Sequence, residues 1–395
     1  MIKFKNHIKL NFLLVLSMTV LLVLQSCSDD PNDLGINYLP TVDTTGVKYL
    51  DSETDTMAIT SNNYKEYINT YLATLLSVGN YQNYESKALL KFYNIDRNLD
   101  SATVISATLK LTYGNYAFKD KTGLTEFNIH KVVRDLNYTT ITNDSVSASD
   151  FSVSSIGGYS GVIADSTSIS MAIDNNTVKD WLEYAADTGY AVKNYGIGLI
   201  PSAASSTIKG FYLINDDGTK VPTLTVIYSK NSVQDTIEFN ASIGLFLANA
   251  PLTVVPNDRI LLQNGIAFRD IMNFDLTKLP RNVIINNATL LFTLDSKNSF
   301  ISETTEKRII IGMVTDSINK KDSLYNNAFL LDTITYSANL NSVFQRWNSG
   351  EMSNLGITLK NYYERVNIDN FAIFSPGYSD STKRPRLKIT YTLRN

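Results

Sequence analysis

The chain contains a single cysteine, Cys27, and only two histidines, His7 and His130. One cysteine cannot form a disulfide within the chain, so the fold is held together without disulfides. Zinc sites and Ser/His/Asp or Cys/His catalytic centres need more of these residues than the chain supplies. The sequence has no glycine-rich phosphate-binding loop either. These absences exclude the commonest hydrolase, metalloenzyme and nucleotide-binding classes.

The chain also lacks an excess of positive charge. It holds 35 lysines and arginines against 38 acidic residues, and three of the lysines lie within the first 26 residues. Without that segment, 32 basic residues stand against 38 acidic residues, a net charge of −6. Because a nucleic-acid-binding surface needs a basic stripe, we expect no nucleic-acid partner.

The N-terminal segment is typical of a bacterial lipoprotein signal. Three lysines precede an apolar run over residues 10–24. The run is about 15 residues long, short of the roughly 20 that a membrane-spanning helix needs. It ends in Leu-Gln-Ser-Cys at residues 24–27, which reads as a lipobox. We predict a signal peptide over residues 1–26 and lipidation of Cys27. An uncleaved anchor and an ordinary signal peptide are the alternatives.

Two or more acyl chains on Cys27 would anchor the protein stably to a membrane, where one chain would not. The residues that follow, Ser28, Asp29 and Asp30, resemble the export signal that sends Bacteroidota lipoproteins to the outer face of the outer membrane. An acidic segment is also typical of a solvated linker. We expect residues 27–44 to form an acidic tether, with the protein on the outer membrane and facing the cell exterior.

Two copies of one sequence cassette follow the tether. Four markers recur in the same order: an apolar strand ending in Phe92 or Phe274, an Ala-Thr-Leu strand, a tryptophan and a closing Pro-x-Leu strand. The tryptophans, Trp181 and Trp347, are the only two in the chain, and a Gly-Ile-x-Leu segment follows each. Ordered matches of this kind indicate an internal duplication.

The periodicity within the cassettes is that of β-strands. Residues 105–113 and 386–393 alternate between apolar and polar side chains, which predicts one buried and one solvated face. Around each tryptophan the apolar spacing becomes helical instead, and Asp174 is a suitable N-cap. We predict an all-β fold of two tandem jelly-roll-like antiparallel β-sandwiches, residues 45–229 and 235–395, each with one short amphipathic helix. The join is expected near residues 229–235.

The cassettes resemble a known module. The matching segments are residues 88–109, 132–135, 196–199 and 222–224 of the first copy, residues 288–290, 356–357 and 384–387 of the second, and both tryptophan helices. Together they resemble the disaggregatase-related repeat, a β-sandwich related to carbohydrate-binding modules and often attached to polysaccharide-degrading enzymes. The N-terminal third also resembles Bacteroidota surface lipoproteins. The resemblance implies a β-sandwich fold and a polymeric ligand.

Tyrosines are the best candidates for ligand contacts. Six lie where the cassette pattern does not demand burial: Tyr64, Tyr67, Tyr81, Tyr84, Tyr362 and Tyr363. A tyrosine ring can stack on a pyranose while neighbouring asparagines bind its hydroxyl groups. The alternative is that these tyrosines border strands and are half-buried. The helical spacing of Trp181 and Trp347 with aliphatic neighbours predicts that both indoles are core residues rather than sugar-stacking platforms.

No cofactor is expected, although two acidic segments offer oxygen ligands for a structural calcium. They are residues 215–218, Asn-Asp-Asp-Gly, and the pair Asp369 and Asn370. A tight hairpin explains the first segment equally well. His130 is expected on the exposed face of its strand. Asp135 and Asp316 end the same strand in each copy, which indicates turn caps rather than a carboxylate pair for glycoside cleavage.

These observations predict a non-enzymatic, lipid-anchored cell-surface protein that binds an extracellular polysaccharide or other polymer. Two sites on one tether would gain avidity for a single polymer chain. The alternative is a structural or docking subunit of an outer-membrane protein complex. An exposed apolar patch or a bare strand edge would favour docking. An aromatic-lined groove at the same place in both copies would favour glycan binding.

Overall fold

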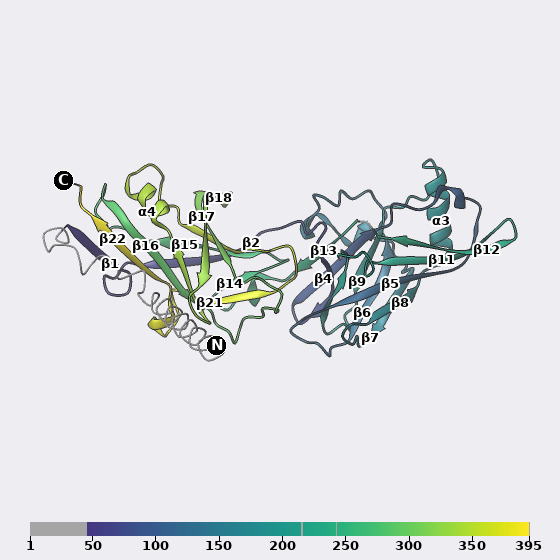
Figure 1. The fold of residues 1–395 in the computed structure, drawn as a ribbon, viewed down its shortest axis with the longest axis horizontal. Helices are drawn as coiled ribbons and strands as arrows, with labels where there is room; N and C mark the ends of the chain where they lie inside the picture. Colours follow the sequence, from purple (N-terminus) through teal and green to yellow (C-terminus); the bar gives the residue numbers. More distant parts are fainter. Residues whose placement is uncertain (1–45, 215, 242, 395) are drawn as a thin grey trace, which may run out of the picture.

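The computed structural model describes residues 46–214, 216–241 and 243–394 (Figure 1). The predicted signal peptide, Cys27, the export-signal residues 28–30 and the tether 27–44 lie outside the described residues. The described part of the chain folds into two antiparallel β-sheets and carries two short α-helices. Each sheet curls around its own hydrophobic core, so the predicted all-β class and the two β-sandwich domains are confirmed.

The first domain contains eleven strands among the described residues, in the order β12-β11-β5-β10-β3-β4-β9-β6-β7, with β13 beside β4 and β8 beside β5. Its elements are β3 (Leu75–Tyr81), β4 (Tyr84–Lys91), β5 (Thr103–Phe118), β6 (Thr125–Lys131), β7 (Gly157–Gly161), β8 (Ser168–Ala172), α3 (Asn175–Ala186), β9 (Ile197–Pro201), β10 (Ile208–Tyr212), β11 (Thr223–Lys230), β12 (Val233–Asn240) and β13 (Ile243–Asn249).

The second domain also has eleven described strands, in the order β1-β22-β16-β19-β18-β17-β20-β15-β14-β21, with β2 beside β15. Its elements are β1 (Val47–Asp51), β2 (Ile59–Lys65), β14 (Arg259–Gln263), β15 (Phe268–Phe274), β16 (Ile284–Thr293), β17 (Ile309–Asp316), β18 (Lys321–Leu330), β19 (Thr335–Asn339), α4 (Asn341–Asn348), β20 (Ile357–Asn361), β21 (Asn370–Phe374) and β22 (Arg386–Thr392).

The two domains repeat the same plan. The series β3 to β11 with α3 corresponds, element by element, to the series β14 to β22 with α4, and the main strand pairings correspond as well. Even a local irregularity recurs. In the first domain, the pairing of β11 with β5 shifts register between Ile227 and Tyr228. In the second domain, the pairing of β22 with β16 shifts at the matching place, between Thr390 and Tyr391. This correspondence supports the duplication inferred from the sequence.

The domain boundaries differ from those expected. Strands β1 and β2 lie within the predicted first domain, residues 45–229, but they pair with β22 and β15 of the second. Strands β12 and β13 lie in or near the predicted second domain, yet they pair with β11 and β4 of the first. The expected join at residues 229–235 is a β-hairpin. Sequence periodicity shows that a segment is a strand, but not which distant edge it joins.

Each helix buries its tryptophan, as predicted. The Asp174 carboxylate caps α3 by accepting hydrogen bonds from the Thr177 backbone N–H and hydroxyl, both at 2.8 Å. Trp181 is 2% exposed and Trp347 is 7% exposed, so both indoles belong to the hydrophobic cores. In α4 the ring centres of Trp347 and Phe344 lie 5.1 Å apart. A glycine at φ +77°, Gly350, follows the end of that helix, as is common where helices terminate.

Most of the predicted strand faces are correct, with exceptions at strand ends. Leu109 and Leu111 are buried on β5, and Leu387 and Ile389 are buried on β22. Ile105, expected in the core, is 45% exposed, and Leu393, also expected in the core, is 47% exposed. Both lie at the end of their alternating runs, where the opposing layer no longer covers the strand.

A third hydrophobic cluster joins the two domains. It combines Tyr84, Phe118 and Phe246 of the first domain with Phe268 and other residues of the second. The turn at Asn264 and Gly265, predicted from the sequence, lies in this contact, and a Cβ on Gly265 would meet the Phe246 ring at 2.8 Å. Gly265 also has φ +68°, which favours glycine. The interface is therefore closely packed.

Candidate functional site

One face of the first domain is covered by its own loop. Leu89 on β4 and Leu247 on β13 pack against apolar side chains from residues 132–156, which connect β6 to β7. Phe151 of this loop lies so close to β9 that a Cβ on Gly198 would meet its ring at 2.5 Å. The loop fills the face that these strands turn away from the main core.

The corresponding face of the second domain is not covered in this way. The connection between β17 and β18 consists only of residues 317–320. Tyr64 on β2 stands where the first domain has Leu247. Thr358 on β20 stands where it has Gly198. The surface that results is polar and aromatic. We call it the open face and define it by Tyr64, Arg269, Asp322, Tyr325, Thr358, Lys360, Tyr362, Tyr363 and Glu364.

An ion pair lies at the centre of the open face. Arg269 donates from Nε and Nη2 to the two carboxylate oxygens of Glu364, at 2.8 and 2.7 Å. Burial alone would lower the pKa of Arg269, but the hydrogen bonds and charge of Glu364 outweigh it and raise the pKa. The neighbouring Tyr64 hydroxyl is largely buried, and burial raises its pKa to about 12. The two hydrogen bonds between Arg269 and Glu364 fix both side chains.

A second group of contacts surrounds Asp322 on β18. Its carboxylate accepts hydrogen bonds from the hydroxyls of Thr358 and Tyr325, at 2.5 and 2.7 Å, and from Lys360 Nζ at 3.2 Å. Burial opposes ionisation of Asp322, but these hydrogen bonds prevail and lower its pKa. Lys360 Nζ also lies 4.8 Å from the centre of the Tyr325 ring. Tyr325 is 59% exposed, so its ring is held in place yet open to solvent.

The open face includes three of the six tyrosines predicted as ligand contacts. Tyr362 and Tyr363 follow β20 and pack edge to face, with ring centres 4.5 Å apart. The Arg308 guanidinium lies 3.4 Å from the Tyr362 ring centre. Tyr363 is 48% exposed. Tyr64 belongs to the same face, but it is only 5% exposed and presents little ring surface to a ligand.

The other three predicted tyrosines lie elsewhere. Tyr81 and Tyr84 flank the turn between β3 and β4, and both rings pack edge to face against Phe118 at the domain interface. Tyr84 is 7% exposed, and its burial raises the pKa to about 12. A shallow hollow beside this turn is lined by both tyrosines and by Ser205 and Ser206. Tyr67 lies in the connection after β2 and is 45% exposed.

The sequence did not point to Arg269, Asp322, Tyr325 or Lys360. These residues come from three strands that are distant in the chain, and each is unremarkable in its own strand. Arg269 and Lys360 do occupy the polar positions of alternating strands. That signal marks a solvent-facing side, but it does not separate an open face from a covered one.

The acidic segments considered for calcium have other roles. Asp369 accepts hydrogen bonds from the Ser302 backbone N–H at 2.6 Å and from the Tyr116 hydroxyl at 2.9 Å. Asp217 accepts two hydrogen bonds from Thr219 in a turn, and Asn215 lies outside the described residues. Within the part of the chain that the structure describes, no three His, Cys, Asp or Glu side chains are grouped in a way that could hold a metal.

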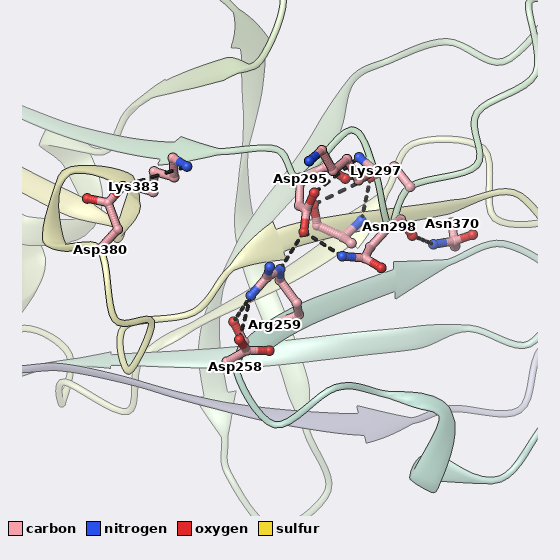
Figure 2. A network of polar contacts seen from close by, with 10 residues as sticks. Asp258, Arg259, Asp295, Lys297, Asn298, Asn370, Asp380 and Lys383 are labelled. Atoms are coloured by element: carbon pink, nitrogen blue, oxygen red, sulfur yellow. Dashed lines mark hydrogen bonds and ion pairs between the residues drawn. The ribbon is translucent and has the colours of Figure 1, made fainter.

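A charge network joins the start of β14 to the segment that follows β16 (Figure 2). Arg259 Nε donates to Asp295 Oδ2 at 2.7 Å, and its Nη1 lies 2.9 Å from an Asp258 oxygen. The guanidinium also lies 4.3 and 4.4 Å from the ring centres of Phe374 and Tyr378, which pack against each other. Asp295 takes a further hydrogen bond from Asn298 at 2.7 Å. Arg259 and Asp295 are thus both paired, and their contacts hold β14 against the segment that follows β16.

One carboxyl group is buried without a regular hydrogen-bond partner among the described residues. Asp270 on β15 has no exposed surface, and neither of its carboxyl oxygens makes a regular hydrogen bond. Burial raises its pKa to about 8, against a smaller opposing contribution from the Asn62 backbone N–H. Asp270 lies inside the second domain, where a substrate cannot reach it.

The remaining predictions concern single residues. Asp316 caps a turn by accepting from the backbone N–H groups of Ile318 and Asn319, both at 3.0 Å, as predicted. His130 was expected to be exposed, but it is half-buried, and its Nδ1 donates to the Ser152 carbonyl at 2.7 Å. The reason is the loop 132–156, which lies over this side of β6.

Comparisons with protein-family models, with curated proteins and with solved structures found no match to this chain. The resemblance to the disaggregatase-related repeat therefore stays a prediction. Among the described residues, neither helix is long and apolar enough to traverse a bilayer.

Proposed function

We propose that this chain is a lipid-anchored cell-surface protein whose second domain binds an extracellular polysaccharide without catalysis. The observation that carries the proposal is the contrast between the two equivalent faces. In the first domain the face is apolar and filled by residues 132–156. In the second it bears the exposed rings of Tyr325 and Tyr363 beside paired charges. The C–H face of a sugar packs on such rings, and nearby polar groups bind its hydroxyls.

This proposal assigns binding to one copy rather than to both. The avidity expected from two sites on one tether would then come from several anchored molecules binding one polymer chain. The favoured ligand is neutral or mixed in charge, because Arg269 and Lys360 are already paired with Glu364 and Asp322.

The test is affinity gel electrophoresis of residues 28–395 through gels that contain single polysaccharides, with and without chelator. The Tyr325→Ala and Tyr363→Ala variants should weaken retardation about tenfold, which corresponds to about 1.4 kcal/mol. Tyr93→Ala is the matched control, because Tyr93 is 52% exposed and also lies under a lysine, Lys91, at 4.6 Å. Equal loss from Tyr93→Ala and Tyr325→Ala would contradict the open face as the site.

A specific observation favours protein docking as a second candidate. The hairpin between β18 and β19 exposes Phe329, Leu331 and Ile334, at 56, 67 and 37%. Exposed apolar side chains that lie close together are typical of protein contacts. If no polysaccharide retards the protein, a Phe329→Ser, Leu331→Ser variant should lose partners in pull-downs from outer membranes.

The anchor is tested separately. Cys27→Ser should abolish incorporation of labelled palmitate and release the protein from membranes. Replacing Ser28, Asp29 and Asp30 with alanine should protect the protein when intact cells are treated with protease. A triple variant that is as protease-sensitive as the parent would show that residues 28–30 act only as a tether.

A further inference from the structure

Each domain is completed by a pair of strands that lies outside the repeated plan. In the first domain these are β12, at the edge of β11, and β13, at the edge of β4. In the second domain they are β1, at the edge of β22, and β2, at the edge of β15. The two pairs occupy equivalent positions: in Figure 1, β1 and β12 lie at the outer ends of the molecule, whereas β2 and β13 lie toward its middle.

The equivalence extends to single residues. Tyr49 pairs with Thr390 in the second domain, and Thr236 pairs with Ile227 in the first. Thr390 and Ile227 both lie next to the register shift that the two domains share. Both added strands run antiparallel to the strand they join. Each pair therefore fills the same acceptor site, formed by the edge of a closing strand and the edge of an entry strand.

The chain order of the two pairs is crossed. Strands β1 and β2 precede the first repeat but complete the second domain, whereas β12 and β13 precede the second repeat but complete the first domain. The connections that cross between the domains, residues 66–74 and 250–258, have the same length of nine residues. The structure thus contains a reciprocal strand exchange between two copies of one fold within a single chain.

The two acceptor sites differ in how their strands are tied to them. Strand β12 follows β11 through a two-residue turn, Asn231 and Ser232, with φ values of 53° and 64°; such a turn fixes a hairpin. Strands β1 and β2 have no direct connection to β22 or β15. Residues 66–74 join them to β3 of the first domain, so their attachment to the second domain depends on non-covalent contacts.

Those contacts are extensive. Leu50 and Met57 are 9% and 5% exposed within the core of the second domain. Arg386 on β22 donates to both oxygens of Asp51, at 2.8 and 2.5 Å. Strand β2 adds seven registered residue pairs with β15. Residues 46–66 therefore form a specific strand pair for this acceptor, and the acceptor cannot distinguish its own copy of that segment from another.

We propose that two copies of this protein pair by exchanging residues 46–66, so that each second domain is completed by its partner's β1 and β2. In such a dimer, the first domain and strands β1 and β2 of one copy pack against the second domain of the other. Every strand pairing and the interdomain cluster are retained. Exchange of an element already present in the fold is a low-cost route to a dimer.

Only the second connection, residues 250–258, changes its path in this dimer. Residues 66–74 keep their path, because β1 and β2 stay beside the first domain of their own copy. Residues 250–258 contain a single 3-10 turn, Leu252–Val254, and Leu252 is 47% exposed. Pro251 and Pro256 flank this turn and restrict its bending, because proline fixes the backbone φ angle. A nine-residue connection with one short turn of its own can lead to the second domain of the same copy or to that of a neighbouring copy.

The test uses cysteines placed in the register of β1 and β22, in the full chain carrying Cys27→Ser. One copy carries Tyr49→Cys and a co-expressed copy carries Thr390→Cys. A disulfide-linked dimer on a non-reducing gel, with the 49–390 bond identified by mass spectrometry, is the expected result. The matched control places Thr236→Cys and Ile227→Cys on separate copies. Their strands are joined by a tight turn, so no cross-linked dimer is expected.

A single chain with both Tyr49→Cys and Thr390→Cys completes the experiment. It should form the 49–390 bond and so verify the register. If this chain closes its own disulfide while the separate variants yield only monomers, residues 46–66 stay with their own chain and the proposal is overturned. Failure of the double variant to form any 49–390 bond overturns the register and the exchange with it. Equal cross-linking by the control pair would also overturn the proposal, because it would reflect random collision.

Discussion

Tyr116 of the first domain and Asp369 of the second form a hydrogen bond across the domain interface. The Tyr116 hydroxyl donates to Asp369 Oδ1 at 2.9 Å and accepts from the Ile368 backbone N–H at 3.2 Å. Burial, reinforced by the charge of Asp369, raises the pKa of Tyr116 well above its usual value. One phenol therefore serves as both donor and acceptor between the two domains.

Tyr116→Phe should destabilise the two-domain body. The change removes a hydrogen bond to a charged group and leaves the Ile368 N–H unpaired, which together cost about 1.5–3 kcal/mol. The measurement is the free energy of unfolding in urea. Tyr93→Phe is the control, because Tyr93 is 52% exposed and should change stability by less than about 0.5 kcal/mol. Equal stability of Tyr116→Phe and the parent would contradict the role of this bond.

Asp51→Asn should weaken the attachment of β1 in a pH-dependent way. Burial tends to raise the pKa of Asp51, but hydrogen bonds from Arg386, the Glu53 backbone and Tyr49 prevail and lower it. The stabilisation from a lowered carboxyl pKa is present above the unfolded value of about 4 and is lost as pH falls below it.

The expected loss for Asp51→Asn is about 2 kcal/mol at pH 7, with the difference from the parent shrinking below about pH 4. Thermal unfolding of both proteins at pH 7 and pH 3 measures it. Asp100→Asn is the control: Asp100 pairs with Lys230 at 2.9 Å, but its side chain is 51% exposed, so a change of at most about 1 kcal/mol is expected. A constant difference at all pH values would argue against the ion pair.

Asp270→Asn should have the opposite effect and stabilise the protein at neutral and alkaline pH. Burial raises the Asp270 pKa to about 8, so the folded protein holds a proton that the unfolded chain releases above about pH 4. The parent should therefore lose stability as pH rises from about 4 to 8, by about 1.4 kcal/mol per pH unit at most. The asparagine variant should lack this slope. Urea unfolding of both proteins at pH 5, 6.5 and 8 would reveal it, and parallel profiles would count against the prediction.

Separation of the domains should reveal which one depends on a distant segment. Residues 68–250 contain β3 to β13 and should unfold cooperatively on their own. Residues 251–395 lack β1 and β2 and should not fold. Adding residues 46–66 after residue 395 through a short turn should restore folding, because Val47 pairs with Thr392. Near-ultraviolet circular dichroism and thermal unfolding distinguish the three proteins. A folded 251–395 fragment would show that β1 and β2 are dispensable.

Local sequence patterns predicted much of this fold. The spacing around Trp181 and Trp347 specified two buried helices, and alternation specified strands such as β5 and β22. The duplication was visible because the markers lie in core positions that both copies must fill. The exposed ends of strands, at Ile105 and Leu393, were missed because alternation continues beyond the point where the opposing layer ends.

The candidate site was less accessible to sequence reasoning. Tyr362 and Tyr363 were identified because they lie outside the cassette pattern, but Tyr325 and Lys360 come together only when β17 pairs with both β18 and β20. The strand exchange was equally hidden, since the side chains of β1 suit a sheet edge in either domain. One contact that favours its partner is the ion pair of Asp51 with Arg386, which are separated by almost the whole chain.

The position of β1 sets the order in which the protein can be completed during synthesis. Its partner β22 is the last of the described strands in chain order and leaves the ribosome tens of seconds after β1, at roughly 5–20 residues per second. The first domain, with β12 joined directly to β11, can close long before. Strand β2, with the sequence Ile-Thr-Ser-Asn-Asn-Tyr-Lys, carries few apolar side chains and so resists aggregation while it is unpaired. The first of the described strands to be made, β1, is thus among the last to be paired.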